Sequence, residues 1–468
     1  MTSKTLPWHD IQTLTRLFDG GQLSALEIVD AQLERIAALD PSLQAFSVLW
    51  PERARATARK LDAAKRNEGA FEGAALRAVP IALKDLCDVK GEPTRAGTTA
   101  LGDRPAESNA EVVDRLEANG AILLGKLKMT EGAFVEHHPS VTPPVNPWKA
   151  DRWTGISSSG SGVAVAAGLC TAALGTDTGG SIRYPSAACG LTGLKPTHGR
   201  ISIRGVYPLA ASLDHIGPMA RSAEDAARVF HALAGYDAGD PWSLKTNPAV
   251  PSTLTRVESL KGRRIGVDET YLHDQVDPEI AAAMDTALGV LEAAGAERVA
   301  IELPSVARSL GAWGLLGSAE MARAHRETFP AKADQYGKAL RATLEMALDH
   351  DPRAVAEGWE ARTEFTRRFA AVFESCDALA APVIPGLFPA NTNLADPKTY
   401  PGTATAARYT TPFNLTGSPA LTFPVGFDRE GAPIGLQLIG RHLAEHDLLQ
   451  MGDAYQQASD WHLRHPQI

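Results

Sequence analysis

The chain has 468 residues, of which 44% are hydrophobic and 22% are charged, values typical of a soluble globular protein with a large core. Its formal net charge of −9 argues against binding to nucleic acid or to an anionic membrane, because such surfaces need clustered Lys and Arg. Four scattered cysteines, none in a Cys-x-x-Cys pair, indicate reduced thiols and a cytoplasmic protein. We expect no signal peptide and no membrane helix, because no stretch reaches the required run of about 18 apolar residues.

In chain order, the predicted elements indicate one α/β domain over residues 1–468. Short apolar runs alternate with amphipathic segments, a pattern typical of a buried, parallel sheet. We expect a helical N-terminal part with Ser24 as an N-cap, a core of strands and helices, a helical insert, and a C-terminal sheet with a helix, over residues 8–65, 75–235, 275–376 and 377–460. The fold class is therefore α/β, with a large mixed, mostly parallel β-sheet covered by helices on both faces.

Residues 151–200 are rich in Gly, Ser, Ala and Thr and contain few bulky side chains. Such a composition can mark a flexible linker. A linker, however, would not carry the apolar run Val163–Ala167 or polar residues such as Asp177 and Lys195. We interpret the small residues as positions where the backbone approaches a bound substrate closely.

Ser181 follows Gly179 and Gly180, just after the apolar run Ala172–Leu174 that we predict to be a strand. At such a strand end, consecutive backbone N–H groups can point into one cavity, where one donor to an oxyanion contributes roughly 3–4 kcal/mol. Taken alone, Gly-Gly-Ser is a weak signal, because most such triplets form turns. A nucleophilic serine also needs a base.

No histidine is an evident base for Ser181. His137 and His138 are adjacent and would face opposite sides of a strand, and His215 directly follows Asp214, which suggests a loop contact. The chain contains no G-x-S-x-G, S-x-x-K or H-E-x-x-H motif. These absences leave lysine as the remaining candidate.

Lys84 ends the apolar run Val79–Leu83 and directly precedes Asp85. An ammonium at the end of a buried strand is unfavourable unless it is paired or becomes neutral. Lys84 could therefore form a structural ion pair with Asp85 or another carboxylate. Alternatively, burial could lower its pKa and make it a base near neutral pH.

Further ordered motifs surround these residues and extend over roughly residues 10–465. They are Pro80–Asp85, Asn146–Trp148, Gly155–Ser186, Gly193–Thr197, Asp214–Ser222 and Phe413–Gly417. Together they resemble the amidase signature family. The resemblance implies the fold of that family and hydrolysis of a carbon–nitrogen bond in a linear amide. The sequence contains no metal, nucleotide or flavin fingerprint, so we predict no cofactor and no metal.

The resemblance also implies a role for each matched residue. Ser181 matches the nucleophile that forms an acyl-enzyme, Lys84 matches the general base, and Ser157 matches the serine after a cis peptide that relays the proton. The backbone oxyanion hole is matched by Thr178, Gly179, Gly180 and Ser181. Supporting positions are matched by Ser158, Asp177 and Arg183.

This chain departs from the family pattern at position 156, where Ile stands in place of the usual Gly. Ser159 and Ser161 also stand where glycine is frequent in the family. We expect the catalytic geometry to survive these departures, with a changed shape of the loop and of the substrate pocket.

The substrate pocket is expected to include Gly132, Ala133 and Phe134, which resemble a stretch that lines the acyl pocket in the family. Phe134 could also be an ordinary core aromatic residue. We expect residues 303–345 and 383–410 to complete the cavity.

The resemblance implies a small-molecule amide as substrate, and members of the family also cleave aryl amides, esters and carbamates. The alternative is a component like the catalytic subunit of glutamyl-tRNA amidotransferase, which carries the same signature but works in a heteromeric complex. A catalytically inactive scaffold is disfavoured, because Lys84, Ser157 and Ser181 are all present. We expect a monomer or homodimer that binds neither nucleic acid nor membranes.

Overall fold

The computed structural model describes residues 6–65, 73–245, 251, 253–394 and 403–468. One sheet of eleven strands extends through this part of the chain. Its strands are β1 (Phe46–Leu49), β2 (Pro80–Lys84), β3 (Ile122–Leu127), β4 (Ala172–Asp177), β5 (Thr192–Lys195), β6 (His215–Ala220), β7 (Arg264–Val267), β8 (Glu297–Ala300), β9 (Ala378–Pro382), β10 (Ala420–Phe427) and β11 (Pro433–Gly440). They are ordered β1-β3-β2-β4-β6-β5-β10-β11-β9-β7-β8.

The sheet is mixed, as the sequence predicted, but it is not mostly parallel. Six of the ten pairings among the described strands are antiparallel. The parallel pairings join β3, β2 and β4 near one edge and β9, β7 and β8 at the other. The sequence could not distinguish parallel from antiparallel strands here. The antiparallel pair β10 and β11 is buried almost throughout, so both strands have the continuous apolar sequence that is typical of parallel strands.

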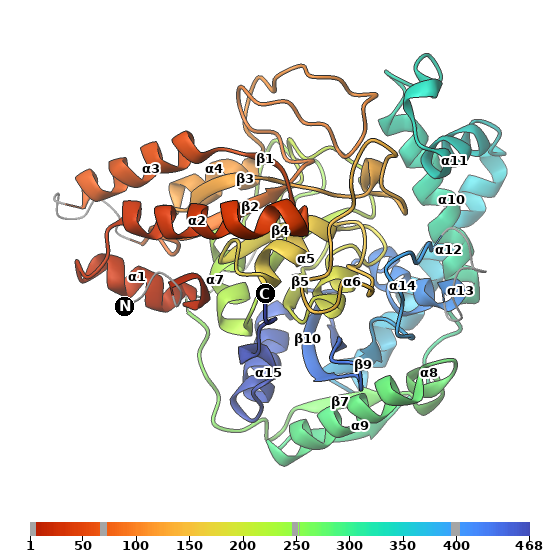
Figure 1. The fold of residues 1–468 in the computed structure, drawn as a ribbon. Helices are drawn as coiled ribbons and strands as arrows, with labels where there is room; N and C mark the ends of the chain where they lie inside the picture. The colour runs from red at the N-terminus through yellow and green to blue at the C-terminus, as the bar shows by residue number, and fades with distance from the viewer. Residues whose placement is uncertain (1–5, 66–72, 246–250, 252, 395–402) are drawn as a thin grey trace.

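Helices cover the sheet on both faces, as expected (Figure 1). They are α1 (Ile11–Asp19), α2 (Ala25–Leu43), α3 (Pro51–Ala64), α4 (Glu111–Ala118), α5 (Ser159–Ala166), α6 (Arg183–Ala188), α7 (Ala223–Leu233), α8 (Glu269–His273), α9 (Pro278–Ala293), α10 (Ala307–Ala324), α11 (Lys338–Leu348), α12 (Pro352–Ala370), α13 (Thr403–Ala406), α14 (Thr411–Leu415) and α15 (Glu445–Gln457). Alternate side chains of β2 show the two faces. Ile81 and Leu83 pack in one core with α4 and α7, and Ala82 packs in another with α2 and α5.

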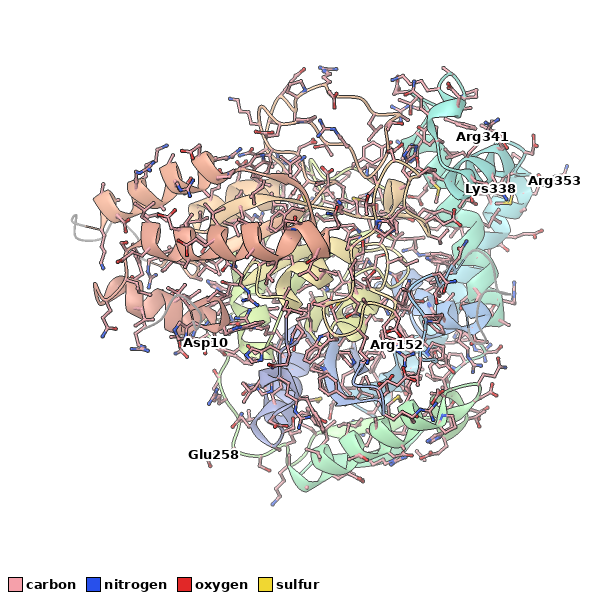
Figure 2. The ribbon with its side chains drawn as sticks, in the orientation of Figure 1. Asp10, Arg152, Glu258, Lys338, Arg341 and Arg353 are labelled. Carbon is pink, nitrogen blue, oxygen red and sulfur yellow. The ribbon has the colours of Figure 1, made fainter. Side chains whose placement is uncertain are left out.

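Helices α1–α3 of the first predicted helical part and α10–α12 of the second lie at opposite sides of the molecule, and α9 of the second part lies along the bottom in this view (Figure 1). Helices α1, α2 and α3 form one side, and Ser24 caps α2 as predicted by accepting the N–H of Glu27. Helix α10 packs against α11 and α12 on the other side, where Lys338, Arg341 and Arg353 lie at the outer surface (Figure 2).

Each of these helical parts also contains a strand that the sequence analysis missed. They are β1 and β8, the two edge strands of the sheet, each only four residues long. Their side chains are mostly exposed or half-buried, so they lack the continuous apolar run that indicated β2 and β4. None of the described helices is long and apolar enough to cross a membrane.

Candidate active site

Lys84 ends β2, and β4 is the parallel neighbour of that strand. The carboxyl ends of both strands therefore lie at the same edge of the sheet. There, Lys84 Nζ donates hydrogen bonds to Ser157 Oγ at 2.7 Å and to Thr176 Oγ1 at 2.8 Å. The alternative ion pair with Asp85 is not formed, because Asp85 Oδ1 lies 3.5 Å from the Nζ of Lys126 on β3.

The Lys84 side chain is completely buried. This burial lowers the pKa of Lys84 to about 7, even though the charges of Asp177, Asp214 and Cys87 act in the opposite direction. An amine with this pKa is partly neutral at neutral pH and can accept a proton.

Ser157 is held in a turn between two buried segments. The peptide bond between Ile156 and Ser157 is cis, and the carbonyl oxygen of Ser157 accepts the N–H of Thr130 at 3.1 Å. Ile156 packs in a small core with Trp153 and Tyr184. The branched side chain of Ile156 therefore packs among apolar residues. The hydrogen bond between Lys84 and Ser157 forms although Ile stands at position 156.

The neighbouring serine hydroxyls also have partners. Ser158 Oγ donates to the carbonyl of Thr176 at 3.3 Å, and Ser161 Oγ donates to the carbonyl of Leu174 at 2.9 Å. These two bonds connect the start of α5 to β4. Ser159 Oγ lies 3.0 Å from His137 Nε2. Two of the positions where glycine is frequent in the family thus carry hydroxyls that tie the loop to its surroundings.

Asp177, the last residue of β4, fixes the loop that contains Ser181. Its Oδ1 accepts the N–H of Gly180 at 2.8 Å, and its Oδ2 accepts the N–H of Ile182 at 3.1 Å. The guanidinium of Arg183 donates to both oxygens, at 2.9 and 3.0 Å, and both side chains are fully buried. Burial alone would raise the pKa of the Asp177 carboxyl, but Arg183 and Lys195 together hold it well below its usual range.

Three consecutive carbonyl oxygens of this loop are held by side chains from elsewhere in the chain. The donors are Asn414 Nδ2 to Asp177 at 2.9 Å, Trp313 Nε1 to Thr178 at 2.7 Å and Thr410 Oγ1 to Gly179 at 2.6 Å. These carbonyls are therefore directed into the protein. Because the N–H of a trans peptide points opposite to its carbonyl, the N–H groups of the same peptides point away from these three donors.

The N–H groups of this loop differ in what they contact. Among the described residues, no hydrogen bond partner is present for the N–H of Thr178, Gly179 or Ser181. The N–H of Gly180, by contrast, is engaged with Asp177. Of the four backbone donors that the sequence suggested, three are therefore unoccupied, and Gly180 already has an acceptor.

Both glycines of the loop are required by the space around them. A Cβ atom on Gly179 would lie 2.5 Å from the ring of Trp313, and one on Gly180 would lie 2.5 Å from the ring of Tyr184. Gly180 also has a backbone φ of 130°, which residues other than glycine rarely adopt. The weak Gly-Gly-Ser signal thus corresponds to a tightly enclosed turn, in which Ser181 is only 9% exposed.

The sequence profile of the family described as Amidase matches residues 27–449. The chain belongs to the amidase signature family. Over 453 residues it is 42% identical to the "Putative amidase AmiD" of Mycobacterium tuberculosis, which covers 96% of this chain and 93% of the relative. It is 37% identical to a Glutamyl-tRNA(Gln) amidotransferase subunit of Chloroflexus aggregans, over 96% of both chains.

Solved structures agree with this membership. The structure of 6-aminohexanoate cyclic dimer hydrolase is 27% identical, has a TM-score of 0.87, and covers 98% of this chain and 99% of that one. The protein is thus an enzyme of a family that hydrolyses carbon–nitrogen bonds in small-molecule amides.

The amidase holds the predicted acyl-pocket residues close to the helical insert. Gly132 and Ala133 belong to a short turn, Glu131–Ala133, and a Cβ on Gly132 would lie 2.8 Å from Leu340 and 3.2 Å from His325. Phe134 is half-buried and packs against the main core. The insert therefore packs against this segment, and the expectation that residues 303–345 complete the substrate cavity stays a prediction.

A cavity of about 570 Å³ lies beside that segment. Its lining includes Val135, Trp153, Ile156 and residues 390–393, but not Phe134 or Ser181. Part of the predicted region 383–410 thus lines a cavity next to the turn of Ser157. Within that region, residues 395–402 lie outside the described part of the chain.

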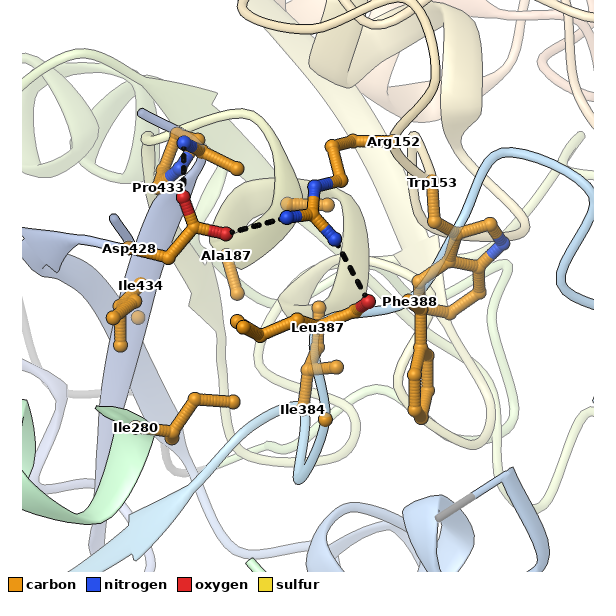
Figure 3. A pocket seen from close by; sticks show the side chains of 14 residues that line it. Arg152, Trp153, Ala187, Ile280, Ile384, Leu387, Phe388, Asp428, Pro433 and Ile434 are labelled. Carbon is orange, nitrogen blue, oxygen red and sulfur yellow. Dashed lines mark hydrogen bonds and ion pairs between the residues drawn. The ribbon is translucent and has the colours of Figure 1, made fainter. Parts of the chain in front are cut away.

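Arg152 lines both this cavity and a smaller one of about 40 Å³ (Figure 3). Its Nη1 donates to the carbonyl of Leu387 at 3.0 Å, and its Nη2 pairs with Asp428 at 3.0 Å. The segment that leads into Ser157 is thereby tied to the C-terminal half of the amidase. Ser181 does not line the smaller cavity either.

Several residues that hold this site were not identified from the sequence. Trp313 and Thr410 lie in segments that were expected only to complete the cavity, and Thr176 and Asn414 lie in motifs that had been noted without a function for these residues. No histidine among the described residues hydrogen-bonds to Lys84, Ser157 or Ser181. No group of three or more His, Cys, Asp or Glu residues in the described ranges could hold a metal ion.

Proposed function

We propose that this amidase cleaves its substrate through an acyl-enzyme on Ser181, with Lys84 as the base and Ser157 as the relay. The observation that carries the proposal is the buried 2.7 Å contact between Lys84 Nζ and Ser157 Oγ. When Lys84 is neutral, its lone pair can take the Ser157 proton, and Ser157 can then take the proton of Ser181. A base at the end of one strand can thus activate a nucleophile on another loop.

The same relay acts in reverse when the acyl-enzyme forms. An amide anion is a very poor leaving group, so the departing nitrogen must receive a proton, which Ser157 can pass on from Lys84. Water then attacks the ester on Ser181 and releases the acid. One lysine therefore serves as base and, after protonation, as the source of the acidic proton.

We propose the N–H groups of Thr178, Gly179 and Ser181 as the main oxyanion donors, with Gly180 contributing less because its N–H is shared with Asp177. Donors that are fixed before the substrate binds need no rearrangement as negative charge develops. Ser158, Asp177 and Arg183 support the site by holding its backbone.

For the substrate we propose a small linear amide, with aryl amides, esters or carbamates as further substrates. Support comes from the cavity next to Ile156, whose lining is partly apolar and partly polar. We propose Gly132, Ala133 and Phe134 as pocket residues because they directly precede Val135, which lines this cavity.

We also propose that residues 1–468 act as one amidase signature domain, because one sheet includes strands from β1 to β11. A cytoplasmic location and a monomeric or homodimeric state stay predictions from the sequence. So does independence from cofactors.

A second candidate function is that of one component of a heteromeric amidotransferase, favoured by the 37% identity to a Glutamyl-tRNA(Gln) amidotransferase subunit over almost the whole chain. The purified chain on its own separates the two functions. Turnover of an anilide without any partner would support the independent amidase, and glutamine hydrolysis only with an added partner would support the amidotransferase component.

The proposal is tested with a panel of anilides, p-nitroanilides, carbamates and esters of varied acyl length. Rapid quenching followed by mass spectrometry of the intact chain should reveal an added acyl mass on a peptide that contains Ser181. Ser181→Ala should show neither turnover nor acylation, and the exposed Ser42→Ala serves as the matched control. Acylation of another residue in the wild-type enzyme would contradict the assignment.

A further inference from the structure

Trp313 lies on α10, in the helical insert and outside every segment that resembles the amidase signature. Its half-buried indole makes two contacts with the loop of Ser181. Nε1 donates to the carbonyl of Thr178 at 2.7 Å, and the ring lies so close to Gly179 that a Cβ there would be 2.5 Å from Cζ2. Trp313 thus contacts both residues that flank one peptide bond.

That peptide bond carries the Gly179 N–H, one of the unoccupied donors of the loop. The carbonyl of Thr178 and the N–H of Gly179 belong to the same planar unit and point in opposite directions. A donor that fixes the carbonyl therefore also fixes the direction of the N–H. Such a hold matters here, because glycine backbone is the most easily rotated.

The neighbouring peptides are held in the same way, but from a different part of the chain. Asn414 holds the carbonyl of Asp177, and Thr410 holds that of Gly179. Both donors lie in or next to α14. Trp313 is the donor that comes from the insert, so it connects that helical region to the reacting centre.

We propose that Trp313 is a positioning residue for the amidase reaction, which orients the Gly179 N–H toward the oxyanion through the carbonyl of Thr178. This inference rests on the proposed function of Ser181 and its oxyanion hole. It gives the insert a role in the chemical step, beyond that of a wall around the substrate.

Trp313→Phe tests the inference, because it keeps an aromatic ring on Gly179 and removes the N–H. We expect kcat to fall by about tenfold to a hundredfold, less than the roughly 10²–10³-fold loss from deleting a whole oxyanion donor. KM should stay within about twofold, because the lost interaction acts in the transition state. The control is Trp359→Phe on α12, an exposed tryptophan whose indole lies over Arg362, and it should leave both constants unchanged.

The affinity of a trifluoromethyl ketone that mimics the acyl group is a second measurement, and it would not change if Trp313 had a purely structural role. Its adduct with a serine places an oxyanion in the hole, so its affinity for Trp313→Phe should fall by the same factor as kcat/KM. Should Trp313→Phe fail to fold, 3-benzothienylalanine at position 313 replaces only the indole N–H by sulfur and serves the same purpose.

Unchanged kcat in a folded Trp313→Phe, or a raised KM with unchanged kcat, would overturn the inference. Failure of the proposed function looks different. In that case Ser181→Ala would keep activity, and the wild-type enzyme itself would not form the ketone adduct.

Discussion

The amidase signature segment and the helical insert use the same kinds of interaction in opposite surroundings. From Trp153 to Ser186, every residue except Gly179 is buried, and the ion pair between Arg183 and Asp177 is fully enclosed. In the insert, the pair of Arg308 and Glu364 has side chains that are 72% and 47% exposed. Burial makes the first pair costly to break, whereas water and salt weaken the second.

This contrast also separates what each region can contribute. The enclosed segment keeps Lys84 and Ser157 within 2.7 Å of each other in surroundings that lower the pKa of the lysine. The insert exposes apolar side chains such as Leu348 and reaches the site through Trp313. The enclosed segment thus contributes Ser157 and Ser181 to the proposed relay, and the insert contributes one contact to the loop of Ser181.

The largest expected effect follows from removing the proposed base, Lys84, which contacts the enclosed segment through Ser157. Lys84→Met should lower kcat/KM by about 10³-fold or more while the protein stays folded, because the relay then has no acceptor for the proton. Steady-state kinetics on an anilide measure the change. Lys128→Met, which removes a half-buried lysine bound to Gln44, is the control that should stay active. Activity of Lys84→Met near the wild-type value would exclude the lysine as the base.

A second expectation concerns the enclosed ion pair. Asp177→Asn should lower the free energy of unfolding by about 3–5 kcal/mol, because it leaves the Arg183 guanidinium buried without its negative partner. Chemical unfolding in urea gives this value, and kcat should fall as well because the loop of Ser181 is released. A loss below about 1 kcal/mol would mean that the buried ion pair costs no more to break than an exposed one.

A third expectation is the pH dependence of the enzyme. Below pH 7 Lys84 is increasingly protonated and cannot accept a proton, so kcat/KM should rise by about tenfold per pH unit up to about pH 7 and then level off. Asp177 and Asp214 act to raise the pKa of Lys84, so Asp214→Asn should move the midpoint of the profile to lower pH. A profile that is flat or that rises toward acid would argue against a neutral lysine.

The smallest effect is expected at the surface of the insert. Glu364→Gln removes the exposed partner of Arg308 and should change the free energy of unfolding by less than about 1 kcal/mol. The same urea titration measures it beside Asp177→Asn. A loss as large as that of Asp177→Asn would show that the insert is held by its surface charges.

Local patterns in the sequence predicted the helical regions and drew attention to Lys84 and Ser181, whereas Ser157 came from the family resemblance. The N-cap at Ser24 and the strand that ends at Lys84 depend on residues that are close in the sequence, so the structure contains both as predicted. The short edge strands β1 and β8 were missed because an edge strand needs no continuous apolar run. The antiparallel centre of the sheet was missed because strand direction depends on the path of the chain between strands.

The sequence by itself determined the residues of the proposed mechanism, since Lys84, Ser157 and Ser181 stand in motifs that resemble those of the family. Only the tertiary structure decided how the backbone between them is directed. Trp313 and Thr410 reach the loop from 135 and 231 residues away, and no local pattern predicts such partners. The Gly180 N–H is engaged with Asp177, whereas that of Gly179 is unoccupied, because these long-range bonds fix the orientation of each peptide.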